Sequence, residues 1–199
     1  MDLLTARRGL ASLIVLAATL GMAQLVLSQA RAPAGTGYRG ASLEYQVKAA
    51  YLLNFTRYVE WPSQAFQAPT DPVRVCVLGR DPFDGVLDAT LEGKTTQGRP
   101  LALRRVRSSA DAAGCHLVFI SRETWRTLGE LPRTLRSPGR LTVGESDEFA
   151  QAGGVIGFVI QDEAVRFVVN AEARDRAGLR ISSRMLSLAA AVYGQELGP

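Results

Sequence analysis

Residues 44–62 read EYQVKAAYLLNFTRYVEWP and give the clearest structural signal in the chain. Apolar side chains recur there at helical spacing, which predicts a helix over about 42–60 with one apolar stripe. The positions assigned to that stripe are Leu43, Val47, Ala50, Tyr51, Asn54, Phe55, Tyr58 and Val59. Ser42 is a candidate N-cap, Glu44 places negative charge in the first turn, and Pro62 is expected to end the helix.

Polar and amphipathic side chains gather at the C-terminal end of this helix. They are Asn54, Arg57, Glu60 and Trp61. A helix that serves only packing does not need such a cluster, so its members are candidates for binding a ligand or a partner. The alternative is that Arg57 and Glu60 form a surface ion pair and that Trp61 fills the core.

The first thirty residues have the pattern of a secretory signal peptide. Arg7 and Arg8 form a positively charged start, residues 10–26 are almost entirely apolar, and Ser28 and Ala30 are small residues that suit a cleavage site. The alternative is an uncleaved N-terminal anchor, because the apolar segment is about long enough to cross a bilayer. Either interpretation predicts that the rest of the chain is exported.

We expect a signal peptide over 1–30, a linker of small residues over 31–41 and one domain over 42–195. Removal of the signal peptide leaves roughly 170 residues, which is enough for a single domain with its own core. The formal net charge is +4, and arginine supplies nearly all of the positive charge. Nucleic acid is not an expected partner, because the domain is predicted to lie outside the cytoplasm.

Cys76 and Cys115 are the only cysteines in the sequence. An even number of cysteines in an oxidising compartment favours a disulfide, with free thiols as the alternative. A zinc site is not expected, because His116 is the only histidine. A catalytic Cys–His pair is not expected either, because neighbouring residues on a strand point to opposite faces.

Strands alternate with helices along the rest of the chain. Strands are predicted over 73–79, 101–106, 115–121 and 139–144, and helices over 81–91 and 122–135. A β-hairpin is predicted over 155–169, a helix over 170–177, and a last helix from 182 or 183 to about 193. This order predicts one three-layer α/β domain, with a mainly parallel sheet, helices on both faces and an antiparallel hairpin extension.

The sequence motifs of nucleotide-binding proteins and hydrolases are incomplete. Gly93, Lys94 and Thr95 resemble the end of a P-loop, but Asp88 stands where the first glycine is required. The turn after the strand at 73–79 lacks the G-x-G-x-x-G pattern, and the sequence contains no G-x-S-x-G. The chain is therefore not expected to be an enzyme, and no cofactor is expected.

A second set of polar side chains lies near the predicted C-terminal helices. It comprises Asn170, Arg174, Arg180, Ser182, Ser183 and Arg184. Arginine side chains and a serine-capped helix suit carboxylate or phosphate groups, so these residues are candidates for binding a ligand or a partner. The alternative is that these residues only cap the ends of helices.

Many collinear blocks of this sequence resemble the YfiR family of periplasmic proteins. The resemblance starts at 44–62 and covers essentially residues 42–190. Its further blocks are 75–83, 93–94 with 98–100, 115–121, 141–143, 149 with 153–158, 165–167 with 170, and 177–186.

The resemblance implies an exported α/β domain with a disulfide and without catalytic residues. The best-understood member of the family dimerises in the periplasm and restrains an inner-membrane diguanylate cyclase by binding its periplasmic sensor domain. An OmpA-like outer-membrane lipoprotein sequesters that member and releases the cyclase, which controls cyclic di-GMP and biofilm formation. Cys76 and Cys115 match one disulfide of the family, whereas the second disulfide of that member has no counterpart here.

The sequence thus predicts a homodimeric regulatory protein of the periplasm. Its expected partner is the periplasmic domain of a diguanylate cyclase or of a sensor kinase, and its expected mechanism is a population shift of that partner. An OmpA-like lipoprotein is a second expected partner. The alternative is a small-ligand sensor whose site uses Arg57, Trp61 and the serines Ser182 and Ser183.

Overall fold

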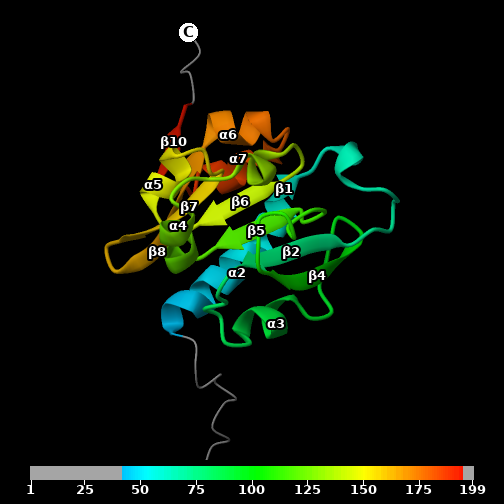
Figure 1. Ribbon diagram of the computed structural model, residues 1–199, viewed down its shortest axis with the longest axis horizontal. Coiled ribbons are helices and arrows are strands. Elements are labelled where there is room, and N and C mark those ends of the chain that lie inside the picture. Colours follow the sequence, from blue (N-terminus) through cyan, green and yellow to red (C-terminus); the bar gives the residue numbers. More distant parts are fainter. Residues whose placement is uncertain (1–41, 195–199) are drawn as a thin grey trace, which may run out of the picture. The chain divides into compact units, whose positions relative to one another are not determined.

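The fold is built on an eight-stranded mixed sheet (Figure 1). The computed structural model describes residues 42–194, so the predicted signal peptide and linker lie outside the described residues. Across the sheet the order is β10 (Ala191–Tyr193), β8 (Ala164–Asn170), β7 (Ile156–Gln161), β6 (Leu141–Gly144), β5 (Leu117–Ile120), β2 (Val73–Leu78), β4 (Arg99–Val106) and β3 (Thr95–Thr96).

The strand directions agree with the predicted fold class. The five strands from β4 to β7 are parallel, β7 and β8 form the predicted antiparallel hairpin, and β3 is antiparallel to β4. The final strand β10 runs parallel to β8 at the opposite edge from β3. The mainly parallel α/β architecture with an antiparallel extension is therefore confirmed.

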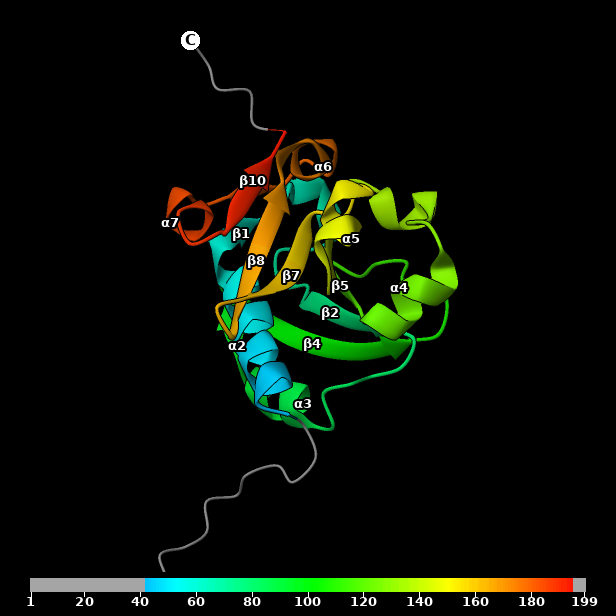
Figure 2. The ribbon, with the colours of Figure 1, turned by 90° about the vertical axis from the view of Figure 1, so that its left-hand side faces the viewer.

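Helices cover both faces of the sheet, as predicted (Figure 2). The larger apolar cluster contains side chains of α2 (Leu43–Tyr58), α3 (Val86–Leu91), α6 (Ala171–Arg176) and α7 (Ser183–Leu186). The smaller cluster lies on the other face and contains side chains of or next to α4 (Arg122–Leu128), η2 (Arg133–Arg136) and α5 (Asp147–Gln151). Alternate residues of β2 and β5 contribute to the two clusters, because successive strand residues point to opposite faces. A short helix, η1 (Ser63–Ala65), follows α2.

The first helix ends earlier than predicted. It stops at Tyr58, and Val59 adopts an extended conformation instead of continuing to Pro62. Val59 and Glu60 form the short strand β1, which pairs antiparallel with β9 (Arg180–Ile181). Strand pairing with a distant segment therefore ends the helix before the proline is reached.

The buried face of α2 also differs from the predicted stripe. Its buried residues are Lys48, Ala49, Leu52, Phe55 and Thr56. Of the predicted stripe, Phe55 and Val59 are fully buried, whereas Leu43, Ala50 and Asn54 are exposed. The predicted stripe is rotated about the helix axis relative to the buried face, which includes Lys48, a residue type that is rarely buried unless its charge is paired. Ser42 has the extended conformation of an N-cap, but its side chain makes no capping hydrogen bond.

Three other helices are shorter than predicted. The helix expected over 81–91 begins only at Val86, because the Asp81 carboxylate accepts a hydrogen bond from the Phe83 N–H and holds a turn there. The helix expected over 122–135 ends at Gly129. The last helix is only α7, and the residues expected to extend it form β10.

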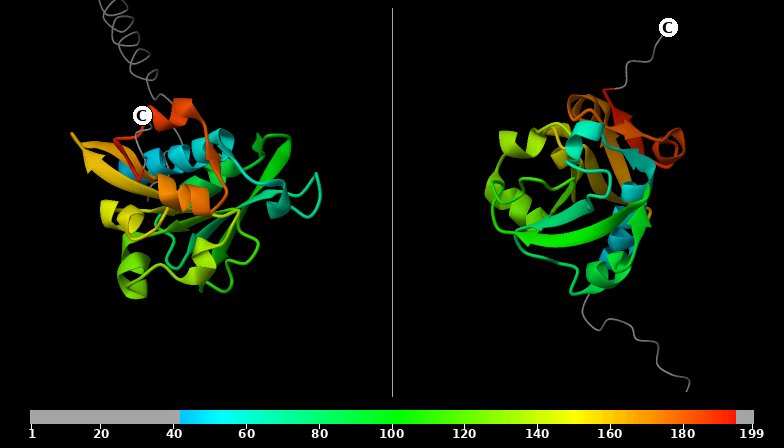
Figure 3. Two further views of the ribbon diagram at one scale, coloured as in Figure 1. Left: turned by 90° about the horizontal axis from the view of Figure 1, so that it is seen from above. Right: turned by 90° about the vertical axis from the view of Figure 1, so that its right-hand side faces the viewer.

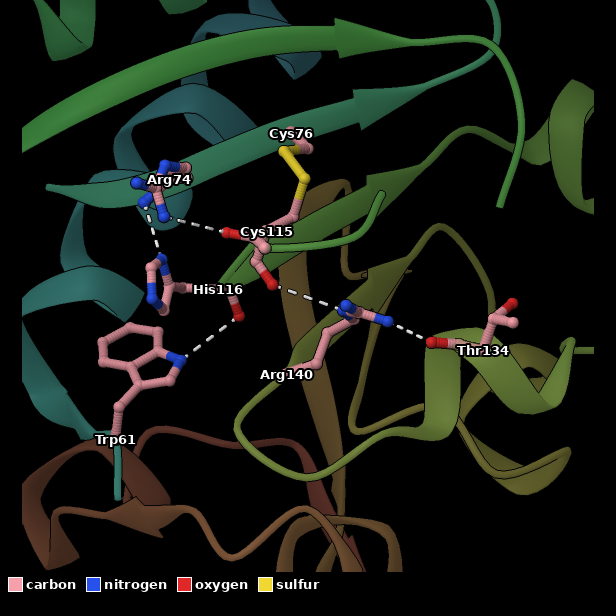
Figure 4. The surroundings of a disulfide bond; sticks show 8 residues. Trp61, Arg74, Cys76, Cys115, His116, Thr134 and Arg140 are labelled. Carbon is pink, nitrogen blue, oxygen red and sulfur yellow. Dashed lines mark hydrogen bonds between the residues drawn. A yellow bond between two sulfur atoms is a disulfide. The ribbon is translucent and has the colours of Figure 1, made fainter. Parts of the chain in front are cut away.

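A disulfide joins the central strand β2 to the start of β5 (Figure 4). It connects Cys76 and Cys115, whose Cα atoms are 6.0 Å apart, and the described residues include no free cysteine. Cys115 precedes the first residue of β5, so the bond runs from mid-strand to a strand start. Within residues 42–194, no helix is long and apolar enough to cross a membrane.

Candidate functional site

Trp61 is part of the core. It is 9% exposed, and its indole N–H donates a hydrogen bond of 3.2 Å to the carbonyl oxygen of His116 (Figure 4). Its ring also meets the imidazole of His116 edge to face. The structure therefore gives Trp61 a packing and hydrogen-bonding role at the start of β5.

His116 is held as a neutral imidazole. The backbone N–H of Arg74 donates to Nδ1 at 2.9 Å, and Nε2 lies 2.9 Å from the carbonyl oxygen of Ala65, which makes Nε2 the protonated nitrogen. Burial lowers the pKa of His116, which agrees with the neutral form. Both ring nitrogens of His116 are hydrogen-bonded to the backbone, and the neighbouring Cys115 is in the disulfide. Cys115 and His116 therefore cannot act as a nucleophile and its base.

Arg57 and Glu60 are both exposed, and they do not form an ion pair with each other. The Glu60 carboxylate instead faces Arg180 across the β1–β9 pair, with Oε2 and Nε 3.7 Å apart. The Arg57 side chain makes no hydrogen bond or ion pair with any residue in 42–194. Of the first predicted cluster, only Arg57 therefore presents an unpaired charge.

Several residues of the second cluster are helix caps. The Asn170 side chain accepts from the Ala173 N–H at 2.8 Å, and its amide donates to the Ala150 carbonyl at 2.8 Å. Ser182 caps α7 by accepting from the Met185 N–H at 3.3 Å. The remaining members differ in surroundings: Arg174 pairs with Asp175, Ser183 is the first residue of α7, and Arg184 follows it.

Helix α2, drawn in cyan, lies next to helix α7, drawn in orange-red, in Figure 3. One residue of each predicted cluster lines a cavity between these two helices. A cavity of about 180 Å³ there is lined by both Asn54 and Arg184. Tyr58 and Leu188, which are 37% and 60% exposed, lie on its rim. We call the surface formed by Asn54, Arg57, Tyr58, Arg184 and Leu188 the α2–α7 surface.

The α2–α7 surface has the composition of a binding surface. It combines an exposed aromatic ring, an exposed leucine and two arginines, and it contains no carboxylate. Arginine and tyrosine are enriched at protein interfaces, where an apolar centre is surrounded by polar groups. In residues 42–194, no group of three or more His, Cys, Asp or Glu side chains is placed to hold a metal ion.

A buried ion cluster at the opposite end of α2 was missed by the sequence analysis. The Lys48 ammonium is 2% exposed and contacts the carboxylates of Glu145 and Glu44. Glu145 follows β6, is almost fully buried, and also accepts a hydrogen bond of 2.7 Å from the Arg122 N–H. The signal in the sequence was a lysine amid alanines and leucines, in a chain with only one other lysine.

The Lys48–Glu145 cluster lies beneath two open cavities. Burial, and then the charge of Glu145, raises the pKa of the nearby Tyr45 well above its usual range. The cavities measure about 600 and 490 Å³, and Arg122, Arg126 and Glu145 line both of them. We call the two cavities together the carboxyl-end groove, because it opens at the carboxyl ends of β2, β5 and β6.

Comparison with known proteins identifies the chain at the level of its family. The sequence model of a family described as YfiR/HmsC-like matches residues 45–190. No curated protein matches the chain.

Two solved structures match the chain at low similarity. One is described as the ABC domain in complex with L-Trp from Streptococcus pneumonia; it is 11% identical, with a TM-score of 0.44 over 75% of this chain and 60% of that one. The other is described as a conserved domain protein from Vibrio cholerae; it is 12% identical, with a TM-score of 0.42 over 60% of this chain and 54% of that one. The chain therefore spans less than two thirds of either structure, and likeness at this level says nothing about function.

Proposed function

The chain belongs to the YfiR/HmsC-like family, and we propose that it is a periplasmic regulatory binding protein that restrains a membrane-bound signalling enzyme. The proposed target is the periplasmic sensor domain of a diguanylate cyclase, so that the protein controls cyclic di-GMP and biofilm formation. The proposal includes a cleaved signal peptide over 1–30 and a linker over 31–41. The observation that carries it is the family match over almost the whole described region.

The α2–α7 surface is the proposed docking site for the sensor domain. Arg57 has no partner within residues 42–194, so its charge is available to an acidic group of another protein. Tyr58 follows Arg57 on α2 and lines the cavity together with Leu188, and both supply exposed apolar area. An interface with an apolar centre and an arginine at its rim gains affinity from burial and orientation from charge.

The mechanism is a shift in the population of the sensor domain. A protein that binds only one conformation of that domain raises the population of this conformation relative to the other by a factor of one plus its free concentration divided by its Kd. Sequestration by an OmpA-like lipoprotein would lower the free concentration of the regulator and release the cyclase. A homodimer would place two α2–α7 surfaces on one particle and suit a dimeric sensor.

The test is the cellular level of cyclic di-GMP. Deletion of the gene should raise this level, and a chromosomal Arg57→Ala/Leu188→Asp variant should raise it to a similar value at unchanged protein abundance. The matched control is Arg133→Ala, which removes an exposed arginine from η2 on the other face of the sheet. An unchanged level in the deletion strain excludes a cyclase as the target and leaves a sensor kinase, whose phosphorylation is then measured in the same strains.

A second candidate function is a small-ligand sensor at the α2–α7 cavity. The observation in its favour is that Asn54 and Arg184 line one cavity although they lie far apart in the sequence. A thermal shift screen with anionic and aromatic metabolites distinguishes the two functions. If a metabolite raises the melting temperature of the parent protein but not of Arg184→Ala, the result supports a ligand site. If no metabolite raises the melting temperature and Arg184→Ala no longer binds the sensor domain, the result supports a protein interface.

A further inference from the structure

One edge of the sheet is open along most of its length. Strand β4 lies at this edge, below β2 in Figure 1, and its outer neighbour is the two-residue strand β3, which pairs only with Arg99 and Pro100. Residues 101–106 of β4 pair in unbroken register with β2 on their inner side. In the part of the chain that the structure describes, no strand pairs with residues 101–106 on their outer side. We call residues 101–106 the β4 edge.

The hydrogen bonds at the two ends of the β4 edge show which backbone groups point outward. The Leu101 N–H donates outward, at 3.0 Å, to the carbonyl of the residue before β3. The Val106 carbonyl accepts inward, at 2.9 Å, from the N–H of the residue after β2. Successive residues of a strand direct their N–H and C=O groups to opposite sides, so Leu103 and Arg105 direct both groups outward. No group within residues 42–194 pairs with these backbone groups.

The β4 edge lacks most of the features that prevent strand pairing. Proteins block open edges with a proline, a bulge or a covering segment, and they place charges along them to repel a second copy. Pro100 lies outside the β4 edge, where β3 already pairs, and the unbroken register with β2 leaves no bulge. Unpaired N–H and C=O groups in a row are what an extended polypeptide recognises when it adds a strand to a sheet. Only charges remain to select the partner.

One face of the β4 edge is basic. Val106 packs in the smaller apolar cluster, so the Arg104 side chain, two residues earlier, lies on the same face of the sheet. Arg104 is exposed, and its side chain makes no hydrogen bond or ion pair within residues 42–194. Arg74 of β2 lies on this face as well, and its guanidinium donates to a backbone carbonyl at 3.5 Å. The acidic side chain near Arg104 is Asp111, which accepts hydrogen bonds from Ser108 instead. This face therefore suits an acidic side chain of a partner.

The opposite face of the β4 edge is apolar and acidic. An open cavity of about 310 Å³ lies there between β4 and α3, lined by Asp88, Leu91, Glu92, Leu101 and Leu103. The Asp88 carboxylate accepts from Arg105 at 2.6 Å, whereas the Glu92 side chain makes no hydrogen bond or ion pair within residues 42–194. Lys94, whose carbonyl bonds to the β4 edge, does not line the cavity. A lysine or arginine of a partner suits this cavity, because its aliphatic stem packs on leucine while its cationic end reaches a carboxylate.

We propose that the β4 edge binds an extended segment of another protein as an added strand, in which acidic side chains toward Arg104 alternate with a basic side chain in the α3 cavity. Successive side chains of a strand point to opposite faces, so the opposite charges of the two faces require an alternating sequence. A second copy of β4 does not fit, because its unpaired Arg104 would stand on the same face as the first and like charges on paired strands repel. The β4 edge shares no lining residue with the α2–α7 cavity, so the two binding sites are separate.

The first experiment titrates capped peptides into the mature protein and follows binding by NMR. The probe TEKEVET carries its glutamates on one face and its lysine and valine on the other. The control TEEEVET lacks the cation, and the control TKKKVKT lacks the anions. We expect the probe to bind at least about tenfold more tightly than either control, since each control places like charge against one face of the β4 edge. Equal binding of all three peptides, or no binding of the probe at millimolar concentration, would overturn the proposal.

The second experiment tests strand addition itself by amide hydrogen exchange. Saturating TEKEVET should slow exchange of the outward Leu103 and Arg105 amides at least about tenfold. The amides of Ala102 and Arg104 point toward β2 and should not change. Methylation of alternate peptide nitrogens should abolish binding in one of the two alternating sets and spare it in the other, because only one set faces β4. Binding without protection of Leu103 and Arg105 would exclude an added strand.

Charge reversal at the β4 edge is the third test. Arg104→Glu should weaken TEKEVET and strengthen TKKKVKT, each at least about tenfold, at an unchanged melting temperature, because the Arg104 side chain contributes no contact to the fold. Arg57→Gln removes an unpaired exposed arginine from the α2–α7 surface and is the matched control, which should leave both affinities unchanged.

A second copy at the β4 edge is the competing outcome. The Leu103 and Arg105 amides would then exchange slowly in the free protein at high concentration and faster on dilution, and this result would overturn the proposal. The proposed regulatory function would survive it, because that function is tested by cyclic di-GMP.

Discussion

The two ends of the same parallel strands are built in different ways. At the amino ends of β2 and β5, the buried polar groups are neutral: His116 accepts from the Arg74 N–H, and the indole of Trp61 donates to the His116 carbonyl, next to the disulfide. The arginines at this end, Arg74 and Arg140, donate to backbone carbonyls and not to buried carboxylates. At the carboxyl ends, ionised groups dominate, with Lys48 and Glu145 buried beneath an open groove.

The amino ends of the strands therefore serve stability, whereas the carboxyl ends have features that suit binding. The amino end is closed by a covalent bond, and its buried polar groups bond to one another and to the backbone. The carboxyl end keeps charges that a purely structural region would replace with apolar side chains. It also keeps open volume, which a well-packed core does not.

The largest predicted effect concerns the closed end. Replacing both Cys76 and Cys115 with alanine should lower the free energy of unfolding by about 4 kcal/mol, because the bond closes a loop with a sequence separation of 39. Urea unfolding of the variant and the oxidised parent measures the difference. A loss below about 1 kcal/mol would show that hydrogen bonds, and not the covalent bond, hold this end together.

The next effect concerns the charged end. Lys48→Met should cost about 3 kcal/mol, because it leaves the Glu145 carboxylate buried without its cation. Adding Glu145→Gln should restore most of this loss, since the glutamine still accepts from the Arg122 N–H. Additive losses in this double-mutant cycle would contradict a coupled pair.

The smallest effect is a dependence of stability on pH. Burial lowers the pKa of His116 below its ordinary value of about 6.5, so the unfolded chain binds a proton more readily than the folded one. The contribution of neutral His116 to the free energy of unfolding is therefore fully present above the ordinary pKa. The free energy of unfolding should fall as the pH drops from 7.5 to 5. Unfolding free energies across this range, compared with those of His116→Asn, measure the contribution. The asparagine variant should show a flatter dependence.

Two carboxylates affect the stability of the fold at lower pH than His116 does. Hydrogen bonds from the backbone of Ala68 and Gln67 lower the pKa of Asp71, and a hydrogen bond from Arg105 lowers that of Asp88. Their contributions are present above their ordinary pKa values near 4 and are lost below them. A loss of stability that began only below pH 4.5 would therefore exclude His116 as its source.

The sheet was predictable because its signals are local. The β5 and β7–β8 strands are continuous apolar or β-branched runs, and such runs identify buried strands without knowledge of their partners. Asn170 and Ser182 were also recognisable, since a cap acts on an amide three residues away. The disulfide followed from the number of cysteines and the expected compartment.

The rest depends on contacts between distant segments. Lys48 is buried because Glu145 neutralises it, and the two are 97 residues apart. The segment after α7 has helical composition, but residues 191–193 form β10 because β8 offers them an unpaired edge. The groove and the α2–α7 surface are likewise assembled from separate crossovers, which no local pattern reveals.

The short pair β1–β9 has a consequence for the timing of folding. It joins Val59 to Ile181, and the Ser182 N–H donates to the Tyr58 carbonyl at 3.0 Å. The segment that fixes the end of the first helix therefore lies 122 residues further along the chain, at Ile181. Contacts between such distant segments form slowly, because a long loop must close before they stabilise anything. The first helix therefore reaches its native end only after the segment that contains Ile181 has joined it.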